Sequence, residues 1–542
     1  MKNKFSRSVA LALVVLGLAP FSSCINELNQ EPSYEPTVES VYRDPARVKE
    51  VLARLYATMA VSGQQGPAGQ PDIAGIDEGF SNYLRQYWMA QELTTDEAIL
   101  AWESDGGVPE YNRLTWSPSH PFVRAMYDRI FYQISLCNEF IRQTSDAKLN
   151  DYGISAAEQT NIRQYRAEAR FLRAMSYYHA LDMFGNVPFA DETSTVGTEK
   201  PRRIERPELF AYVESELKAT VDDLAPARTN EFGRADQAAA WMVLAKLYQN
   251  APVYLSTTPG GTTGTDRSAE VITYTKKIID SGYQLTGTYA DLFRTDNSSV
   301  ARSEIILPVR FDGVRTKTYG GMTFIIHASV GGKMSVDDFG IDNGWGGTRT
   351  KKNLVNLFPE SQADKRAMFF SDGQSLEITK PATFTDGYGV TKFKNVSSKG
   401  VAGNDKVFPD TDFPLFRLAD AYLMYVEAVV RGGAGGTTAQ AVTYLNALRQ
   451  RAYGNASGNI TAADLTGQKG LDLVLNERGR ELYWEGHRRT DLIRFGKYAR
   501  GYNWPFKGGV QAGTDVELTR TLFPLPTSDL TANPNLKQNP GY

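Results

Sequence analysis

The stretch 159–184 restricts the fold of this chain more than any other part of the sequence. Its apolar residues fall on two faces of a helix, one with Ile162, Tyr165, Ala169, Leu172 and Met175 and the other with Phe171, Ala174, Tyr178 and Leu181. A helix that is apolar on two faces packs between neighbouring elements. Gly185 and Pro188 follow and end it. The pattern therefore predicts a long helix inside a helical scaffold.

Further segments have the features of paired helices. Pro207 opens a helix whose apolar residues step by three and four until Pro226. Residues 241–248 match the first half of a tetratricopeptide repeat, 171–178 match it more loosely, and 441–448 resemble a second half. In such repeats a small residue lets two antiparallel helices approach, and aromatic residues fill the groove between them. We predict a mostly α-helical fold built on helix pairs, too irregular to form a plain solenoid.

Three long segments between the helices are rich in glycine and aromatic residues, namely 62–120, 308–350 and 371–414. Loops of this length in a compact protein either carry function or lack structure. Their tryptophan and tyrosine residues argue against lack of structure, because disordered chains are poor in aromatic residues. We therefore expect the binding face on these segments and the helix pairs behind them as a rigid support.

The first residues have the pattern of an export signal. Lys2, Lys4 and Arg7 precede a short apolar run at 9–18, and Ser22, Ser23 and Cys24 follow. This arrangement predicts a signal peptide over 1–23. A cysteine directly after small residues resembles a bacterial lipobox, which implies an acylated Cys24, a tether over 24–44 and a folded body over 45–542. The alternative is a secreted protein without an anchor.

The sequence contains no motif for binding a metal, a cofactor or a nucleic acid. The four histidines, His120, His179, His327 and His487, stand in no metal-ligand pattern, and no Walker loop or nucleophile elbow occurs. The net charge of −3 and the lack of a basic stripe argue against nucleic-acid binding. With Cys24 acylated, Cys137 is the remaining cysteine, and its apolar helical surroundings predict an inert buried thiol. We expect no cofactor, no metal and no enzymatic activity.

Carboxylate pairs are the main argument for a hydrolase, because glycosidases use two of them. Glu477, Glu481 and Glu485 share one helix face, but arginines surround them, which predicts a structural ion network. Two other pairs are better placed to contact a ligand, namely Asp96–Glu97 near Trp102 and Asp77–Glu78 near Arg85. A neutral sugar uses such carboxylates as hydrogen-bond acceptors, without catalysis.

Several blocks together resemble the SusD/RagB family. They span nearly the whole chain in the order of the family: 166–174 with 182–189, 233–236, 414–422, 445–452, 476–482, 485–496, 523–526 and 538–542. The resemblance implies four tetratricopeptide-like helix pairs with a loop-rich part that has few short strands. It divides the body into parts of about 45–250 and 251–542. It also implies a lipoprotein on the outer face of the outer membrane that binds glycans and covers a SusC-like, TonB-dependent transporter.

A narrower resemblance concerns the ligand. The segments 63–66, 71–79, 92–97, 101–102, 115–118, 311–321 and 343–345 are similar to those of starch-binding members of the family.

This narrower resemblance implies an arc of Trp102, Tyr319 and Trp345 that cradles a curved α-glucan, with Asp77, Arg85 and Asp105 as hydrogen-bonding partners. Asp105 stands where the starch-binding relative has an amide, so it can accept but not donate.

The leading hypothesis is thus capture of starch or malto-oligosaccharide. Three alternatives stay open: another neutral glycan such as a fructan or xylan, a glycoside hydrolase, and a purely structural cover for the transporter. A flat chain such as cellulose cannot contact all three rings of a curved arc. A structural calcium is also an open question, because Asp291, Asp296 and Asn297 supply oxygen atoms in one loop but lack EF-hand spacing.

Overall fold

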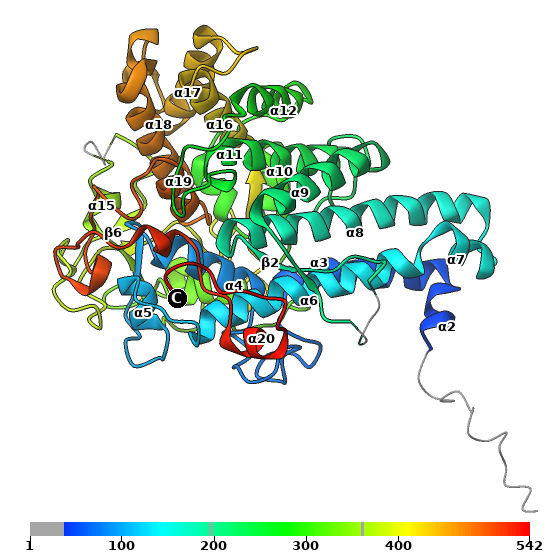
Figure 1. Cartoon of the computed structure of the whole chain (residues 1–542). Helices are drawn as coiled ribbons and strands as arrows, with labels where there is room; N and C mark the ends of the chain where they lie inside the picture. Colours follow the sequence, from blue (N-terminus) through cyan, green and yellow to red (C-terminus); the bar gives the residue numbers. More distant parts are fainter. Residues whose placement is uncertain (1–36, 195–196, 198, 359–362) are drawn as a thin grey trace, which may run out of the picture.

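The fold is mostly helical, with few and short strands, as the sequence predicts (Figure 1). The computed structural model describes residues 37–194, 197, 199–358 and 363–542. The expected signal peptide and Cys24 lie outside the described residues. Among the helices of the described ranges, none has both the length and the apolar character needed to cross a membrane.

The N-terminal helices correct one expectation. Helix α2 (Val38–Tyr42) forms inside the stretch expected to be tether, and α3 (Pro45–Ala60) follows it. Thr37 caps α2 by accepting a hydrogen bond from the Ser40 amide. The Tyr42 ring is buried and meets Phe140 edge-on at 6.1 Å. An aromatic side chain with a partner of this kind folds a segment whose polar composition alone suggested a tether.

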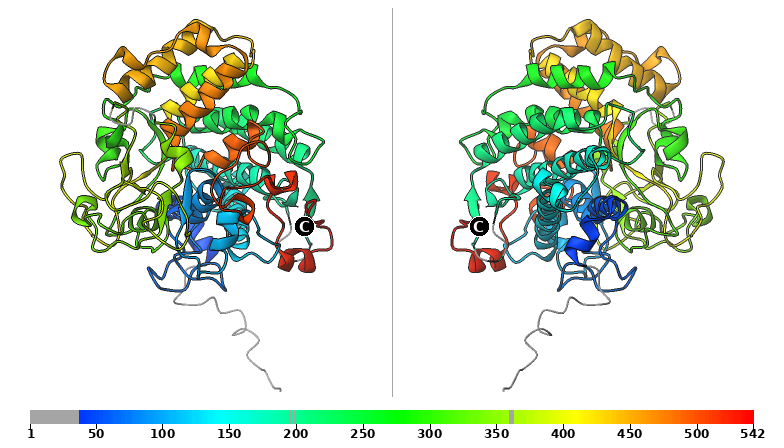
Figure 2. Two further views of the ribbon diagram at one scale, coloured as in Figure 1. Left: turned by 90° about the vertical axis from the view of Figure 1, so that its left-hand side faces the viewer. Right: turned by 90° about the vertical axis from the view of Figure 1, so that its right-hand side faces the viewer.

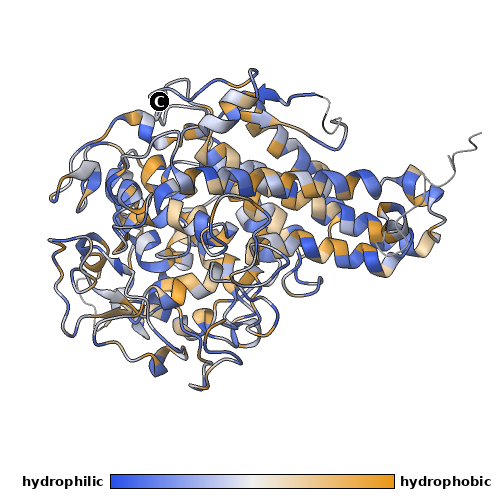
Figure 3. Cartoon of the chain, turned by 90° about the horizontal axis from the view of Figure 1, so that it is seen from below, coloured by the Kyte–Doolittle hydropathy of each residue, from blue (hydrophilic) through white to orange (hydrophobic). Residues whose placement is uncertain are grey.

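The helix predicted over 159–184 is α8 (Ala156–Met183), which packs along α6 (Pro121–Gln143) and α9 (Arg206–Thr220). Figure 1 shows α6 and α8 reaching outward side by side, with the short helix α7 (Asp146–Asp151) at the far end. In Figure 3 the helices of this arm carry hydrophilic and hydrophobic residues along their length. Gly185 ends α8 in a left-handed conformation with φ +72°, which favours glycine.

The other long helices stack upon one another in chain order. Helix α10 (Gln237–Gln249) packs on α12 (Ser268–Asp280), α12 packs on α16 (Leu418–Val430), and α16 packs on α17 (Thr438–Tyr453) and α18 (Gly467–Leu482). This stacking is the tetratricopeptide-type arrangement that the sequence predicts. Figure 2 shows the helices on one side of the molecule and the loop-rich segments, coloured green to yellow, on the other.

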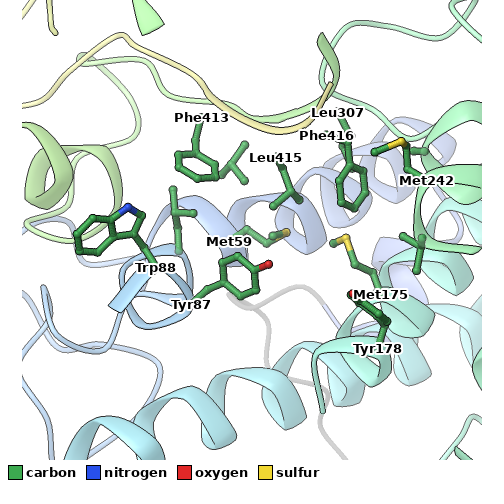
Figure 4. Close-up of a cluster of buried hydrophobic side chains, with 14 of the residues drawn as sticks. Met59, Tyr87, Trp88, Met175, Tyr178, Met242, Leu307, Phe413, Leu415 and Phe416 are labelled. Atoms are coloured by element: carbon green, nitrogen blue, oxygen red, sulfur yellow. The ribbon is translucent and has the colours of Figure 1, made fainter. Parts of the chain in front are cut away.

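The strands of the described residues form four antiparallel pairs. These are β1 (Ala98–Leu100) with β5 (Thr348–Thr350), β2 (Val187–Phe189) with β3 (Arg202–Ile204), β4 (Ile305–Val309) with β8 (Phe413–Arg417), and β6 (Phe369–Phe370) with β7 (Gly389–Val390). The pair β4–β8 lies in the core (Figure 4), where Leu307, Leu415 and Phe416 meet aromatic and methionine side chains of the helices.

Short helices interrupt two of the three segments expected as loops: α4 (Tyr83–Trp88), η2 (Met89–Leu93) and α5 (Val108–Arg113) lie within 62–120, and α14 (Gly321–His327) lies within 308–350. The other short helices are α11 (Ala251–Tyr254), α13 (Asn297–Val300), α15 (Lys352–Val355), α19 (Arg488–Arg494) and α20 (Thr527–Ala532). The 3-10 turns are η3 (Val221–Asp223), η4 (Tyr289–Phe293), η5 (Asp337–Phe339), η6 (Ala456–Gly458), η7 (Ala462–Leu465), η8 (Lys507–Gly509) and η9 (Leu518–Thr521).

The predicted ion network is present and buried. Glu481 on α18 accepts hydrogen bonds from Arg366 at 3.1 Å and from Arg417 at 2.7 Å, and it also pairs with Arg451. Burial opposes the charged form of Glu481, but Arg451, Arg417 and Arg366 outweigh it and lower its pKa to about 2. A carboxylate held ionised in this way stabilises structure and cannot act as a general acid at neutral pH.

Replacing Glu481 by glutamine is expected to lower the free energy of unfolding by about 3–5 kcal/mol at pH 7, because it leaves buried guanidinium groups without their anion. The pKa is lowered in the folded state, so the stabilisation is present above the ordinary value of 4.5 and is lost as the pH falls towards 2.

Urea unfolding at pH 7 and pH 4 measures this effect. The difference in the free energy of unfolding between variant and wild type should be smaller at pH 4 than at pH 7. Glu517→Gln is the matched control, because Glu517 is exposed and 3.6 Å from Arg500. It should change the stability by less than about 0.5 kcal/mol. An equal effect of both substitutions would contradict the prediction.

Candidate functional site

The strand pair β1–β5 brings Trp102 and Trp345 together. In the antiparallel register Ala98 faces Thr350 and Leu100 faces Thr348, so the residues just after β1 lie beside those just before β5. The indole Nε1 of Trp102 donates to the Trp345 carbonyl oxygen at 3.3 Å, and the ring centroids are 6.2 Å apart. Both side chains are half-buried. Two of the three predicted aromatic residues therefore form one surface.

Close backbone packing sets the position of the Trp102 ring. A Cβ atom on Gly347 would lie 2.8 Å from Cζ2 and 2.9 Å from Cε2 of that ring. Real Cβ atoms do not approach so closely, so the ring can occupy this place only because residue 347 has no side chain.

The substitution Gly347→Ala is expected to displace the Trp102 ring and to weaken ligand binding roughly tenfold. Forcing a methyl group into a filled space costs about 1–3 kcal/mol, and 1.4 kcal/mol is a factor of ten in affinity. Gly106→Ala is the control, since a Cβ there meets no atom within 4 Å. Titration calorimetry with maltoheptaose measures the affinity of both variants. Equal affinities would show that close packing against Gly347 does not hold the Trp102 ring in place.

Tyr319 is exposed, with 39% of its surface accessible, and a buried carboxylate anchors its backbone. The Tyr319 amide donates to Glu78 Oε2 at 2.9 Å, and the Thr318 hydroxyl donates to Glu78 Oε1 at 2.5 Å. The ring of Tyr319 lies 5.6 Å from that of Phe408. Glu78 was expected to contact a ligand. It is buried and instead joins the segment around residue 78 to the Tyr319 loop.

Arg85 on α4 is a buried guanidinium between aromatic rings. Its Cζ lies 3.8 Å from the centroid of Phe80, 4.1 Å from that of Phe324 and 5.8 Å from that of Trp102. Within the described residues, Nε and Nη2 have no hydrogen-bond partner, and the carboxylates of Asp77, Asp105 and Glu78 act on the guanidinium only through their charge. Burial lowers the pKa of Arg85 to about 9, and the charges of Asp77 and Asp105 act against this shift. Nε and Nη2 are enclosed by the protein, so a ligand can reach these donors only if the surrounding rings move.

The two predicted aspartates lie near Arg85 but keep different surroundings. Asp77 is exposed, and its Oδ1 accepts a hydrogen bond from the Phe80 amide at 3.2 Å. Asp105 is half-buried, with the Ser104 hydroxyl 3.5 Å from its Oδ1. Both carboxylates therefore keep oxygen atoms that can accept hydrogen bonds from hydroxyl groups.

The expectation that Asp96 and Glu97 contact a ligand is wrong. Both are buried, and Arg488 donates two hydrogen bonds of 2.7 Å to Asp96. The Trp484 amide donates to Glu97 at 3.1 Å. These partners lie almost 400 residues further along the chain, so no local pattern could have identified them.

Among the described residues, no group of three or more His, Cys, Asp and Glu side chains is arranged to hold a metal ion. Asp296, considered for calcium, accepts hydrogen bonds from the amide and hydroxyl of Ser398, at 2.8 and 2.6 Å. Asn297 donates to the carbonyl oxygens of Leu292 and Asp412. Cys137 is buried, and burial raises the pKa of its thiol to about 12, which makes it inert as predicted.

The sequence as a whole matches known proteins. A model described as the SusD family matches residues 328–542. The starch-binding protein SusD of Bacteroides thetaiotaomicron is 34% identical to this chain, with 100% of both chains covered. The chain belongs to the SusD family.

Solved structures of SusD-type proteins agree in fold. A SusD homolog from Bacteroides thetaiotaomicron has a TM-score of 0.72 and 19% identity, over 93% of this chain and 98% of its own. Surface glycan-binding protein A from the same organism, solved in complex with laminarihexaose, has a TM-score of 0.67 and 18% identity, over 91% and 99% of the two chains. These likenesses establish the SusD-type helical fold.

Proposed function

We propose that this protein binds starch or malto-oligosaccharide and passes it to a TonB-dependent transporter without cleaving it. One observation supports the proposal above the others. The aromatic surface of Trp102 and Trp345 lies beside a buried guanidinium, Arg85, whose Nε and Nη2 have no partner within the described residues. An unsatisfied buried donor costs stability, and a ligand that accepts from it after a shift of the neighbouring rings would offset this cost.

The chemistry of the site suits a neutral sugar. The faces of Trp102, Tyr319 and Trp345 can stack on the apolar faces of pyranose rings. Arg85 would donate to sugar hydroxyl groups, and Asp77 and Asp105 would accept from them. An α-glucan is favoured because the relative that is 34% identical over the whole chain is named a starch-binding protein. Modest affinity for short chains is expected, because hydroxyl groups exchange bonds to water for bonds to protein.

The proposed place of action is the outer face of the outer membrane. There, Cys24 would carry acyl chains and residues 24–36 would connect the anchor to α2. The proposed partner is a SusC-like transporter that this protein covers. The SusD family membership supports both proposals.

Another neutral glycan is the second candidate. The structural neighbour named as a complex with laminarihexaose shows that the fold also serves a glucan other than starch. Its identity to this chain is 18%, so it gives no preference to that ligand here.

A glycoside hydrolase is not favoured by the carboxylates. Burial raises the pKa of Glu92 to about 7 and that of Glu97 well above its usual range, as a general acid would require. However, both side chains are enclosed in the protein, and the Gly486 and Trp484 amides donate to them at 2.6 and 3.1 Å. A sugar cannot reach them without unfolding of the core.

Titration calorimetry of the chain from residue 25 onward, with maltoheptaose and with cellohexaose and laminarihexaose, tests the proposal. Binding of maltoheptaose alone is the expected result. Preference for a β-glucan would replace starch by another glycan at the same site. No heat with any of the three sugars would remove the α-glucan assignment.

A further inference from the structure

His327 occupies a junction between two loops of the proposed binding surface. It is the last residue of α14 and is almost fully buried. Its ring lies against Trp345, with the centroids 4.9 Å apart and the planes inclined by 31°. Its carbonyl oxygen also accepts a hydrogen bond of 2.8 Å from the Trp345 amide. Both the backbone and the side chain of Trp345 therefore depend on the position of this histidine.

Each nitrogen of the His327 ring faces a carbonyl oxygen. Nδ1 lies 2.8 Å from the Asn343 carbonyl oxygen, and Nε2 lies 3.0 Å from the Val407 carbonyl oxygen. A neutral imidazole has one N–H, so it can satisfy only one of these acceptors and turns a lone pair towards the other. An imidazolium donates to both. The arrangement of acceptors therefore matches the protonated ring.

The two carbonyl groups belong to different parts of the site. Asn343 precedes Trp345, and its Oδ1 accepts a hydrogen bond from the Trp345 indole Nε1 at 2.9 Å. Val407 precedes Phe408, whose ring lies 5.6 Å from that of Tyr319. A ring that donates to both carbonyl groups ties the support of Trp345 to the support of Tyr319.

The surroundings of the His327 ring shift its pKa in opposite directions. Burial lowers the pKa of His327, while the two carbonyl oxygens and the carboxylate of Asp342, 3.7 Å from Nδ1, act to raise it. Beside Val407, Asp405 pairs with Lys317 at 3.7 Å and Lys406 pairs with Asp337 at 3.4 Å. The net pKa lies below 6.5, so the ring gains its second proton on the acid side of neutrality.

We propose that His327 is a positioning residue of the binding surface, which as an imidazolium donates to Asn343 and Val407 together and joins the Trp345 loop to the loop beneath Tyr319. The inference rests on the proposed function for its effect on sugar binding. Affinity is greatest when both bonds are made, and it falls as the pH rises and the ring loses one proton.

The first test needs no ligand. A cation held against an indole ring interacts electrostatically with its π electrons. Protonated imidazole quenches the fluorescence of a nearby indole ring. Tryptophan fluorescence of the wild type is expected to fall as the pH is lowered from 8 to 5. The change should disappear in His327→Phe, which keeps an aromatic ring against Trp345, and shrink in Trp345→Phe. The same curve in the wild type and in His327→Phe would overturn the proposed protonation.

The second test is calorimetry with maltoheptaose at pH 5, 6, 7 and 8. The wild type should bind several-fold more tightly at pH 5 than at pH 8, whereas His327→Phe should bind more weakly and without this dependence. His327→Gln keeps one donor and should recover part of the affinity, again without the dependence, and it serves if the Phe variant does not fold. Wild-type affinity and pH profile in both variants would overturn the proposal.

Failure of the proposed function has a different signature. In that case the wild type binds no maltoheptaose at any pH, and the role in sugar binding falls with it. The fluorescence titration still decides whether His327 links the two loops as an imidazolium.

Discussion

Replacing Trp102 by alanine is expected to weaken maltoheptaose binding by about 2 kcal/mol or more, which is roughly thirtyfold. Trp102 contacts both Trp345 and Arg85 in the proposed surface. Its indole donates to Trp345, its ring meets Phe324 edge-on at 5.9 Å, and it forms one wall around Arg85. The substitution removes a stacking face and also opens the surroundings of the buried guanidinium. Titration calorimetry measures the loss.

Trp241→Ala is the matched control for this experiment. Trp241 is also half-buried, but it lies on α10, where it packs near Lys277 of α12. Its removal should leave the affinity unchanged. Unchanged affinity in Trp102→Ala would contradict the proposed site, whereas equal losses in both variants would indicate a general loss of structure.

Trp345→Ala should have an effect of similar size, and the double variant should lose less than the sum. The rings of Trp102 and Trp345 are 6.2 Å apart and share a hydrogen bond, so each substitution already disturbs the other ring. Residues in contact do not act independently.

The helical scaffold could be predicted from local patterns. The two apolar faces of 159–184 and the small residues of the tetratricopeptide-like segments depend on neighbours three or four positions away, and they appear as α8, α10 and α17. The strands could not be predicted. β1 and β5 are three residues each and exist only because they pair across about 250 residues.

The site could be predicted in part. The resemblance to the SusD/RagB family suggested Trp102, Tyr319 and Trp345, and the structure places Trp102 beside Trp345. The resemblance could not show that the Glu78 side chain turns inward and accepts a hydrogen bond from the Tyr319 amide. Nor could it show the distant partner of Asp96, because a carboxylate looks the same in sequence whether it faces a ligand or a guanidinium.

Arg85 is the residue for which the structure predicts opposite effects on stability and binding. Arg85→Met should raise the free energy of unfolding by about 1–4 kcal/mol, the range observed when well-packed apolar residues replace buried charges. A methionine fits between Phe80 and Phe324 without the cost of burying a charge. The same substitution should weaken maltoheptaose binding at least tenfold, because two donors are lost. Gain of stability with loss of binding is the pattern of a residue retained for its ligand.

Arg129→Met provides the contrast. Arg129 is as deeply buried as Arg85 and its Nη1 also lacks a hydrogen-bond partner, but its Nε and Nη2 donate to the Ser81 and Ser62 carbonyl oxygens and to the Ser81 hydroxyl. Its removal leaves these acceptors unpaired and should lower the free energy of unfolding by about 3 kcal/mol. Urea unfolding of the two variants at pH 7 measures the difference. If Arg85→Met were as destabilising as Arg129→Met, the guanidinium of Arg85 would be structural, and its two free donors would no longer be an argument for a sugar at this site.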